Sequence, residues 1–249
     1  MSKVITIIGG NGYVGRRCIE TILTNTRDVK IFSVSRQVET NSLKTFNDRV
    51  EYIKGDALNP QTFSNILKQS SGIIHTVGKL ISFDDQSYEK INYDTAIRIA
   101  EVSNNLVQGD ERKKNFVFIS AERGFIFPLS IPFGGYINYK RKAEEKLLKD
   151  FSNLNTVILR PGLISDLKDR PYLLPFSYLT KVASCFEKNV LENISPRSGE
   201  KIGIPASSIE LDTLSIYAVA GALGKLCMKI YPNDYMNNLE NLRKFKLDV

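Results

Sequence analysis

The sequence predicts an α/β protein: a Rossmann-type, doubly wound parallel sheet with helices on both faces and a small C-terminal lobe. The first observation behind this prediction is the β-branched run at residues 4–8, which is typical of a strand buried on both faces. The second is the cluster of glycines that follows this run directly. The third is the alternation of strand-length apolar runs with helical spacing, because such βαβ units form parallel sheets through right-handed crossovers.

Each element is expected from its own pattern. Short apolar runs bounded by turn residues predict strands at residues 4–8, 29–34, 50–53, 73–77, 116–119 and 156–159. Apolar residues three or four positions apart predict helices at residues 13–24, 60–67, 88–106 and 136–148. After Gly162, prolines and serines become frequent. We therefore expect one domain over residues 1–162 and a smaller substrate or partner lobe over residues 163–249, packed on it, with helices near residues 177–187 and 211–228.

The composition excludes several classes of protein. The 249 residues are 42% hydrophobic and 24% charged, which is ordinary for a globular chain with a substantial core. Three widely spaced cysteines rule out a disulfide scaffold, and a single histidine leaves no cluster with metal-ligand spacing. We expect no membrane-spanning helix, no secretory signal and no N-terminal presequence, because the apolar runs are short and the first strand starts almost at the first residue.

The net charge of +7 invites a nucleic-acid interpretation. The basic residues are, however, scattered among 27 acidic ones, and the densest basic run, at residues 140–142, is followed by Glu144 and Glu145. A solvated helix face explains this pattern better than a phosphate-backbone site, so we expect no nucleic-acid partner. A modest attraction to anionic membrane surfaces or anionic ligands remains open.

The glycines after the first strand form the strongest motif of the chain. G-x-x-G-x-x-G is satisfied by Gly9, Gly12 and Gly15, and G-x-G-x-x-G by Gly10, Gly12 and Gly15. Glycine permits a tight turn and a close approach of the backbone to a pyrophosphate, and the N-terminus of the next helix attracts phosphates. In this strand–turn–helix context we expect an NAD(P)-binding domain rather than a purely structural turn. The expected contacts are Gly9, Gly10, Asn11, Gly12, Tyr13, Val14 and Gly15.

The end of the second strand predicts which dinucleotide is bound. An NAD site favours Asp or Glu there for the ribose hydroxyls, whereas this chain has Ser35 and Arg36. A guanidinium beside a hydroxyl suits a 2′-phosphate, so NADP(H) is favoured and NAD(H) stays open. The alternative is that Arg36 is a solvated loop arginine.

Two more strand ends supply cofactor candidates. Asp56 and Ala57 follow the third strand, where a carboxylate could accept a hydrogen bond from an adenine amino group or brace the turn. His75 and Gly78 follow at the end of the fourth strand, at the edge where such sheets bind ligands. His75 could equally be a core histidine, and Gly78 is the better candidate for cofactor contact.

Tyr136 and Lys140 form Y-x-x-x-K at the start of a predicted helix, so both side chains lie on one face. A nearby ammonium stabilises a phenolate and lowers the pKa of a tyrosine toward the range of an acid/base catalyst. The same lysine could hold a nicotinamide ribose. One such spacing is expected by chance among 11 tyrosines, so its value comes from its place between the fifth and sixth strands.

Taken jointly and in order, these motifs resemble those of the extended and atypical short-chain dehydrogenase/reductases, over about two-thirds of the chain. The chain is most similar to the atypical branch with the nucleotide-binding accessory subunit of respiratory complex I and a short-chain-dehydrogenase-like protein of the fungal coenzyme Q (ubiquinone) biosynthetic complex. The residues that carry this resemblance are 9–15, 34–36, 56, 75–78, 116–125, 135–144 and 159–162.

The resemblance implies roles for individual residues. Tyr136 would be the catalytic acid/base and Lys140 its partner. The family's substrate-polarising serine or threonine falls on Ala121, with Ser120 one residue early. A shift of one residue at a strand end points a side chain to the other face, so either Ser120 serves through a local bulge or the hydroxyl is missing.

The resemblance also implies a setting. Pro161 and Gly162 would lie beside the nicotinamide. The protein would lie on the matrix side of the mitochondrial inner membrane, with peripheral membrane contact and with protein partners in a coenzyme Q biosynthetic complex. None of this follows from composition or spacing.

The apolar segment at residues 124–135 bears on the substrate. It suits a hydrophobic substrate such as a quinone precursor, a partner protein or a membrane interface, and the alternative is packing against the C-terminal lobe. Two functions therefore compete: an NADP(H)-dependent oxidoreductase acting in ubiquinone biosynthesis, and a non-catalytic nucleotide-binding accessory or regulatory subunit. A nucleotide-sugar epimerase ranks third.

Overall fold

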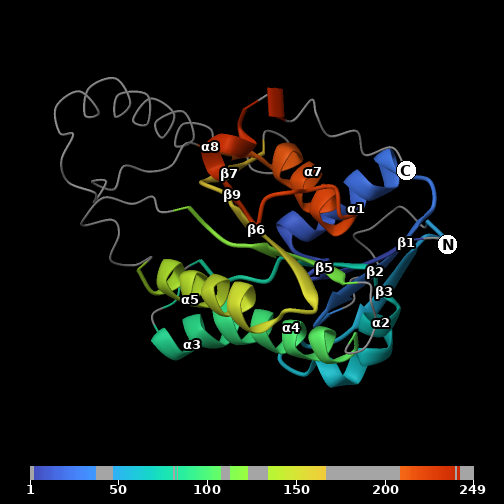
Figure 1. The fold of residues 1–249 in the computed structure, drawn as a ribbon, viewed down its shortest axis with the longest axis horizontal. Helices are drawn as coiled ribbons and strands as arrows, with labels where there is room; N and C mark the ends of the chain where they lie inside the picture. The colour runs from blue at the N-terminus through green and yellow to red at the C-terminus, as the bar shows by residue number, and fades with distance from the viewer. Residues whose placement is uncertain are drawn as a thin grey trace.

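The structure is a computed structural model that describes residues 3–37, 47–80, 82, 84–107, 113–122, 134–166, 208–238 and 240–241. Seven parallel strands form one sheet with helices on both faces (Figure 1). Across the sheet the strands are β3 (Val50–Lys54), β2 (Val29–Ser35), β1 (Lys3–Ile8), β4 (Gly72–His75), β5 (Lys114–Ile119), β6 (Leu154–Arg160) and β9 (Ile230–Pro232). This order is that of a doubly wound Rossmann sheet, so the predicted fold class is confirmed.

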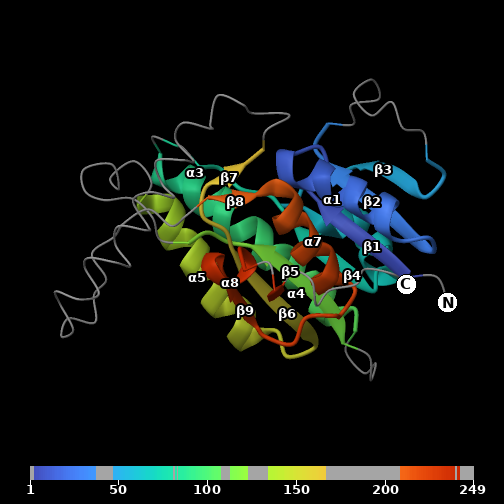
Figure 2. The ribbon, with the colours of Figure 1, turned by 90° about the horizontal axis from the view of Figure 1, so that it is seen from above.

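Two layers of helices enclose the sheet, as the two views show (Figures 1 and 2). One layer holds α1 (Tyr13–Asn25) and α7 (Leu211–Ala222), and the other α2 (Ser64–Gln69), α4 (Thr95–Asn105) and α5 (Gly134–Asp150). In β1, Ile5 and Ile7 pack against the first layer and Ile8 against the second. Most of the strand is apolar because each of its faces meets a layer of helices.

The predicted helix at residues 88–106 is divided into three segments: α3 (Asp85–Glu89), the π-helical turn η2 (Lys90–Asp94) and α4. The buried Asn92 lies in the π turn. Its side-chain oxygen accepts the N–H of Lys79 (2.9 Å), and its amide donates to the carbonyl of Lys79 (3.1 Å). The wider turn lets this amide face the loop after β4.

Part of the predicted C-terminal lobe belongs to the Rossmann layers. β9 extends the main sheet by pairing with β6, and α7 shares a hydrophobic core with α1. Residues 211–232 thus pack within the Rossmann layers: the helix at the start of this segment was predicted, whereas the three-residue strand β9 was too short to be predicted. The division at residue 162 otherwise stays a prediction, and the helix expected at residues 177–187 lies outside the described residues.

The remaining short elements frame the carboxyl edge of the sheet. They are η1 (Pro60–Phe63), the parallel pair β7 (Ile164–Ser165) and β8 (Ile209–Glu210), and α8 (Asn233–Met236). The helix predicted to reach residue 228 ends at Ala222, because Gly224 turns the chain with a φ of +75°. Within the described ranges, no helix has the length and apolar character needed to cross a membrane.

Candidate dinucleotide and catalytic site

The glycine-rich loop joins β1 to α1 at the carboxyl edge, where the strand order reverses between β1 and β4. Gly9 has a φ of +88°, and a Cβ atom there would lie 2.8 Å from Thr76 Oγ1. A Cβ on Gly10 would lie 2.0 Å from Ser33 Oγ, and one on Gly15 would lie 2.3 Å from the Gly9 carbonyl oxygen. Glycine is therefore required at all three positions to keep the turn and the close packing of α1 on β1.

The start of α1 is suited to an anion. Gly12 occupies the N-cap position without a side-chain hydrogen bond, and the first turn contains no acidic residue. Tyr13 and Val14 open the helix, and Val14 is buried. The N-cap residue thus offers no side chain to the first-turn N–H groups or to the positive end of the helix dipole, which suits a pyrophosphate site.

Hydrogen bonds hold the glycine-rich loop beside the end of β2. The N–H of Asn11 donates to Ser35 Oγ (3.0 Å), and the Asn11 side-chain amide donates to the carbonyl of Gln37. Arg16 Nε donates to the carbonyl of Asn11 (2.8 Å). The exposed Arg36 follows Ser35 and so lies at the rim of the loop. A 2′-phosphate at this rim would meet a guanidinium and a hydroxyl whose proton can still be donated.

At the end of β3, Asp56 has the turn-bracing role that was given as the alternative to an adenine contact. Asp56 Oδ1 accepts the N–H of Leu58 (3.0 Å), so this carboxylate braces the turn that leads into η1. Ala57 is buried in the layer of α2 and α4. A contact of Asp56 or Ala57 with an adenine stays a prediction.

Lys140 of α5 is buried between β4 and β5, with 2% of its surface exposed. Its Nζ donates to the carbonyls of Ile119 (2.8 Å) and Val77 (3.2 Å). It also lies 4.5 Å from the ring centroid of Phe118 and 6.0 Å from that of Tyr136. The predicted tyrosine–lysine pair is therefore brought together at the carboxyl edge of the sheet.

The pKa values of this pair follow from burial. Loss of hydration lowers the pKa of Lys140 to about 7, against an opposing effect of Glu144. Burial raises the pKa of Tyr136 to about 12, so the expected lowering by the ammonium is not seen. A phenol with such a pKa keeps its proton at neutral pH and is suited to donate it.

Gly78 marks the point where the loop after β4 meets α5 and the π turn. A Cβ there would lie 3.4 Å from both Lys140 Nζ and Asn92 Oδ1, and the residue itself is exposed. Sequence reasoning did not identify Asn92, although an asparagine inside an apolar helical pattern is a signal for a buried polar role. The prediction that Gly78 contacts a cofactor agrees with this position but stays untested.

His75 is enclosed by the core. Its ring is 0% exposed, with ring centroids 5.6 Å from Phe118 and 6.5 Å from Phe116. Among the described residues neither ring nitrogen has a hydrogen-bond partner. Burial, and secondly the charge of Lys140, lower the pKa of His75 to about 3, so the imidazole is neutral. The structure places this side chain as a core histidine, and its predicted cofactor contact could involve only the backbone.

Ser120 lies at the end of β5 and points into the α5 layer. Its N–H continues the ladder to β6 by donating to the carbonyl of Leu159 (2.8 Å), without the bulge that one alternative required. Its buried hydroxyl donates to Glu144. The Ser120 hydroxyl proton is therefore used in the bond to a carboxylate, and the catalytic role of Ser120 stays a prediction. The next residue, Ala121, has no hydroxyl.

Pro161 and Gly162 are held by residues that the sequence did not single out. The carbonyl of Pro161 accepts the N–H of Glu122 (2.7 Å), and the N–H of Gly162 donates to Oδ1 of the buried Asn233 (2.7 Å). Asn233 starts α8, 71 residues further along the chain. These bonds fix the chain after β6 at the carboxyl edge, where a nicotinamide contact is predicted.

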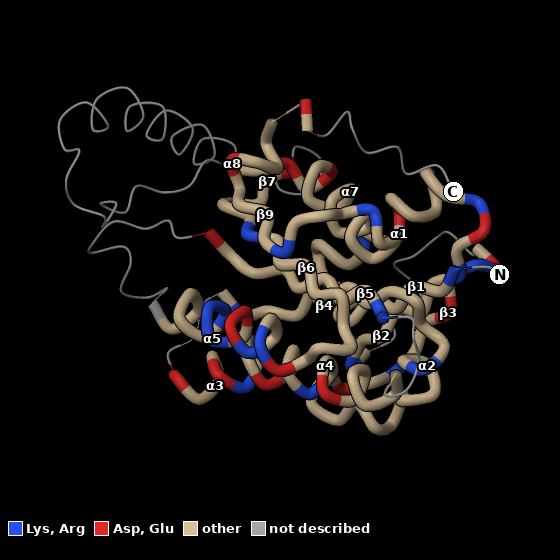
Figure 3. The backbone as a smooth tube through the Cα atoms, in the orientation of Figure 1, with Lys and Arg blue, Asp and Glu red and all other residues tan. Residues whose placement is uncertain are grey.

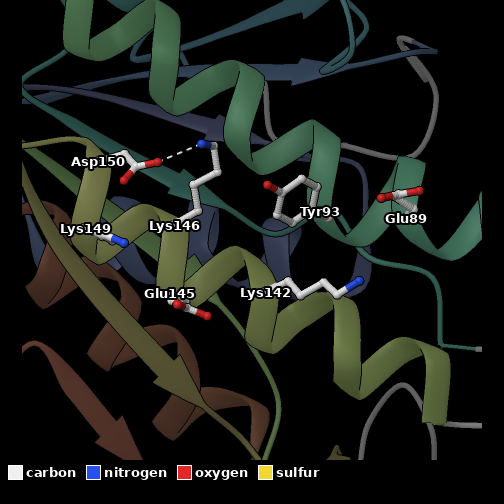
Figure 4. Close-up of a pocket in the computed structure, with 7 residues that line it drawn as sticks. All are labelled: Glu89, Tyr93, Lys142, Glu145, Lys146, Lys149 and Asp150. Carbon is white, nitrogen blue, oxygen red and sulfur yellow. Dashed lines mark hydrogen bonds and ion pairs between the residues drawn. The ribbon is translucent and has the colours of Figure 1, made fainter.

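A groove of about 400 Å³ lies elsewhere, on the outer face of α5 (Figure 4). Basic and acidic residues are interspersed along α5, as the charge-coloured backbone shows (Figure 3). Because Lys140 and Glu144 occupy the opposite, buried face of α5, this groove is separate from the candidate site. Its lining residues are Glu89, Tyr93, Lys142, Glu145, Lys146, Lys149 and Asp150.

The glycine turn, the uncapped helix and the sheet order define a dinucleotide-binding Rossmann protein. The profile of a family described as NAD(P)H-binding matches residues 9–175, more than half of the chain. The chain belongs to this NAD(P)H-binding family. The predicted likeness to atypical short-chain dehydrogenase/reductases is confirmed at this level.

Individual relatives are distant. The chain is 26% identical over 241 residues to "MIOREX complex component 2" of Saccharomyces cerevisiae, covering 78% of this chain and 84% of the relative. It is also 26% identical over 163 residues to a chloroplastic protein of Arabidopsis thaliana. This match covers 66% of this chain and 51% of the relative.

Solved structures agree with the fold. The enzyme WbmF of Bordetella bronchiseptica, in complex with NAD+, superposes with a TM-score of 0.63 at 15% identity, covering 93% of this chain and 73% of that one. A short-chain dehydrogenase of Leptospira borgpetersenii with bound NAD+ superposes with a TM-score of 0.59 at 16% identity. The superposition covers 85% of this chain and 92% of that one. At such identities these neighbours show the fold alone.

Proposed function

We propose that this chain is an NADP(H)-dependent oxidoreductase that acts on a hydrophobic substrate. The observation that carries the proposal is the meeting of Lys140, Tyr136 and Gly78 on the same edge of the sheet as the glycine-rich loop. The bound nicotinamide would supply or accept the hydride. Lys140 would hold the cofactor ribose through its remaining donor capacity, and Tyr136 would exchange the proton with the substrate oxygen.

The preference for NADP(H) is supported by the end of β2. Ser35 and the exposed Arg36 lie beside the glycine-rich loop, and the described strand end offers no carboxylate to accept from ribose hydroxyls. The proposed direction is reduction, since burial leaves the Tyr136 phenol protonated at neutral pH. A carbonyl or quinone oxygen would accept that proton as hydride arrives.

For the cellular setting we propose the mitochondrion, on the matrix side of the inner membrane, and a role in ubiquinone biosynthesis. The support is indirect: the named relatives are a component of the yeast MIOREX complex and a chloroplastic protein, which favours an organelle. The apolar segment at residues 124–135, which we expected to face a hydrophobic substrate, partner or membrane, lies outside the described residues except for its last two glycines, which open α5.

A second candidate function has its own observation. The hydroxyl of Ser120 donates to Glu144, and Ala121 occupies the place of the substrate-polarising residue. A site built this way could bind the dinucleotide without turning over a substrate. We therefore keep a non-catalytic nucleotide-binding subunit as the alternative.

Calorimetric titration with NADPH and NADH tests the cofactor proposal. Arg36→Ala should weaken NADPH binding about 10–100-fold and NADH binding about 2-fold or less, because only NADPH carries the 2′-phosphate. Arg27→Ala, an exposed arginine just before β2, is the matched control. Equal losses of affinity for both cofactors would contradict the proposal that Arg36 binds the 2′-phosphate.

Turnover separates the two candidate functions. NADPH oxidation is followed with phenanthrenequinone, a hydrophobic quinone probe, on wild type and Tyr136→Phe. The oxidoreductase proposal expects turnover that Tyr136→Phe lowers about 100-fold or more with NADPH binding unchanged. Tight NADPH binding with no turnover for any quinone tested would favour the non-catalytic subunit.

A further inference from the structure

Glu144 is the most heavily hydrogen-bonded carboxylate in the described part of the chain that borders the candidate site. It is 3% exposed and accepts from the hydroxyl of Ser120 at the end of β5. It also accepts from Arg141 Nη1 (2.7 Å) and, with both of its oxygens, from Arg160 Nε (3.1 Å to each). One carboxylate thus ties α5 to the carboxyl ends of both β5 and β6.

The surrounding polar groups extend this contact to the loop after β6. Arg141 pairs with Glu122 at 3.5 Å, and the N–H of Asn233 donates to Glu122 (3.4 Å). Asn233 in turn holds Gly162. The predicted nicotinamide-side residues and α5 therefore share one network whose central acceptor is Glu144.

The network lies one helical turn from Lys140. Among the described residues, the printed contacts of the Lys140 ammonium are with backbone carbonyls and aromatic faces, and none is with a carboxylate. Of the described titratable groups around it, His75 comes from β4 and has its own pKa lowered by Lys140, Tyr136 lies with its ring centroid 6.0 Å away, and Glu144 of α5 favours the charged form of Lys140. Glu144 is the anion among them, and Arg141 and Arg160 set how much of its charge Lys140 experiences.

We propose that Glu144 is a positioning residue that fixes α5 against β5 and β6 and supports the positive charge of Lys140. The same network engages the hydroxyl of Ser120, at the end of β5, in a hydrogen bond to Glu144. The inference rests on the proposed role of Lys140 in holding the cofactor. It concerns the lysine before any cofactor binds, so it can be tested whether or not NADPH binding is found.

The test is competitive labelling of each lysine with trace acetic anhydride from pH 6 to 11, measured by mass spectrometry on the full chain. The plateau of the labelling curve reports access to Lys140, and its midpoint reports the lysine charge. If Glu144 had only a structural role, its substitution would change the plateau of the Lys140 labelling curve and leave the midpoint unchanged. Lys146, on the opposite face of α5, provides the internal reference.

Glu144→Gln keeps the shape and removes the charge, so the Lys140 midpoint should fall by about one pH unit. Glu144→Asp keeps the charge and should keep the midpoint close to that of wild type even where thermal stability drops. Arg160→Gln should move the midpoint the other way, because it removes a cation and leaves Glu144 less neutralised; it also tests the proposal should Glu144→Gln fail to fold. Unchanged midpoints in the folded variants would overturn the inference.

Discussion

The two halves of the candidate site are built differently. The nucleotide half consists of backbone and small side chains, and its shape is set by Gly9, Gly10 and Gly15 within one short segment. The catalytic half depends on side chains that arrive from separate elements: Lys140, Asn92, Glu144 and Asn233. Nucleotide binding thus depends on residues close together in the sequence, whereas catalysis depends on residues that only the fold brings together. We therefore expect mutations to affect cofactor binding and turnover separately.

The largest effect is expected in the nucleotide half. In Gly15→Ala the new Cβ would lie 2.3 Å from the Gly9 carbonyl oxygen and 2.8 Å from Gly10 Cα, so the loop must move. Calorimetry should show a loss of NADPH affinity of about 100-fold or more. Gly221→Ala is the matched control, because its Cβ would meet Val117 Cγ2 at 2.8 Å in the core under α7. An equal loss in both variants would mean that general instability, rather than the loop, is responsible.

The next effect concerns the catalytic half alone. Ala121→Ser restores a hydroxyl at the position of the polarising residue, and quinone turnover should rise about 10-fold or more at unchanged NADPH affinity. Ser120→Ala should leave turnover as it is and cost about 1–2 kcal/mol in unfolding free energy, since Glu144 loses a buried donor. A collapse of turnover in Ser120→Ala would instead make Ser120 the catalytic hydroxyl.

Acid stability provides a third, smaller effect. The pKa of His75 is lowered to about 3 in the folded chain, so the unfolded chain binds its proton first as the pH falls below about 6.5. The wild type should therefore lose about 2 kcal/mol of unfolding free energy from this group by pH 5. Urea midpoints at pH 7.5 and 5 should differ less in His75→Phe, whose ring cannot be protonated. The same pH dependence in both proteins would show that His75 is not the cause.

The smallest effect is expected on the outer face of α5. Asp150→Asn removes the exposed pair of Lys146 and Asp150 (2.7 Å), and such pairs contribute little. Thermal unfolding should shift by about 1 °C or less, and NADPH binding should not change. A clear loss of cofactor binding would mean that the charged groove on this face belongs to the site after all.

The sequence predicted what is local and missed what is distant. The strand–glycine–helix segment and all six strands up to β6 follow from patterns within short windows, and their positions are confirmed within a few residues. The orientation of Ser120 could not be predicted, because it is set by Glu144, 24 residues away. The same holds for Asn233, which meets Gly162 only after the chain returns to the sheet as β9.

If the proposed site is correct, one dinucleotide spans both of its halves, and protection of Lys140 from labelling is the sharpest test. Acetylation of Lys140 is measured alone, with NADPH, and with 2′,5′-ADP, which carries only the adenosine and phosphate part. We predict that NADPH slows labelling strongly and that 2′,5′-ADP binds without protecting. If Lys140 stays as reactive in saturating NADPH as in its absence, the two halves do not form one site, because the nicotinamide would then not reach α5.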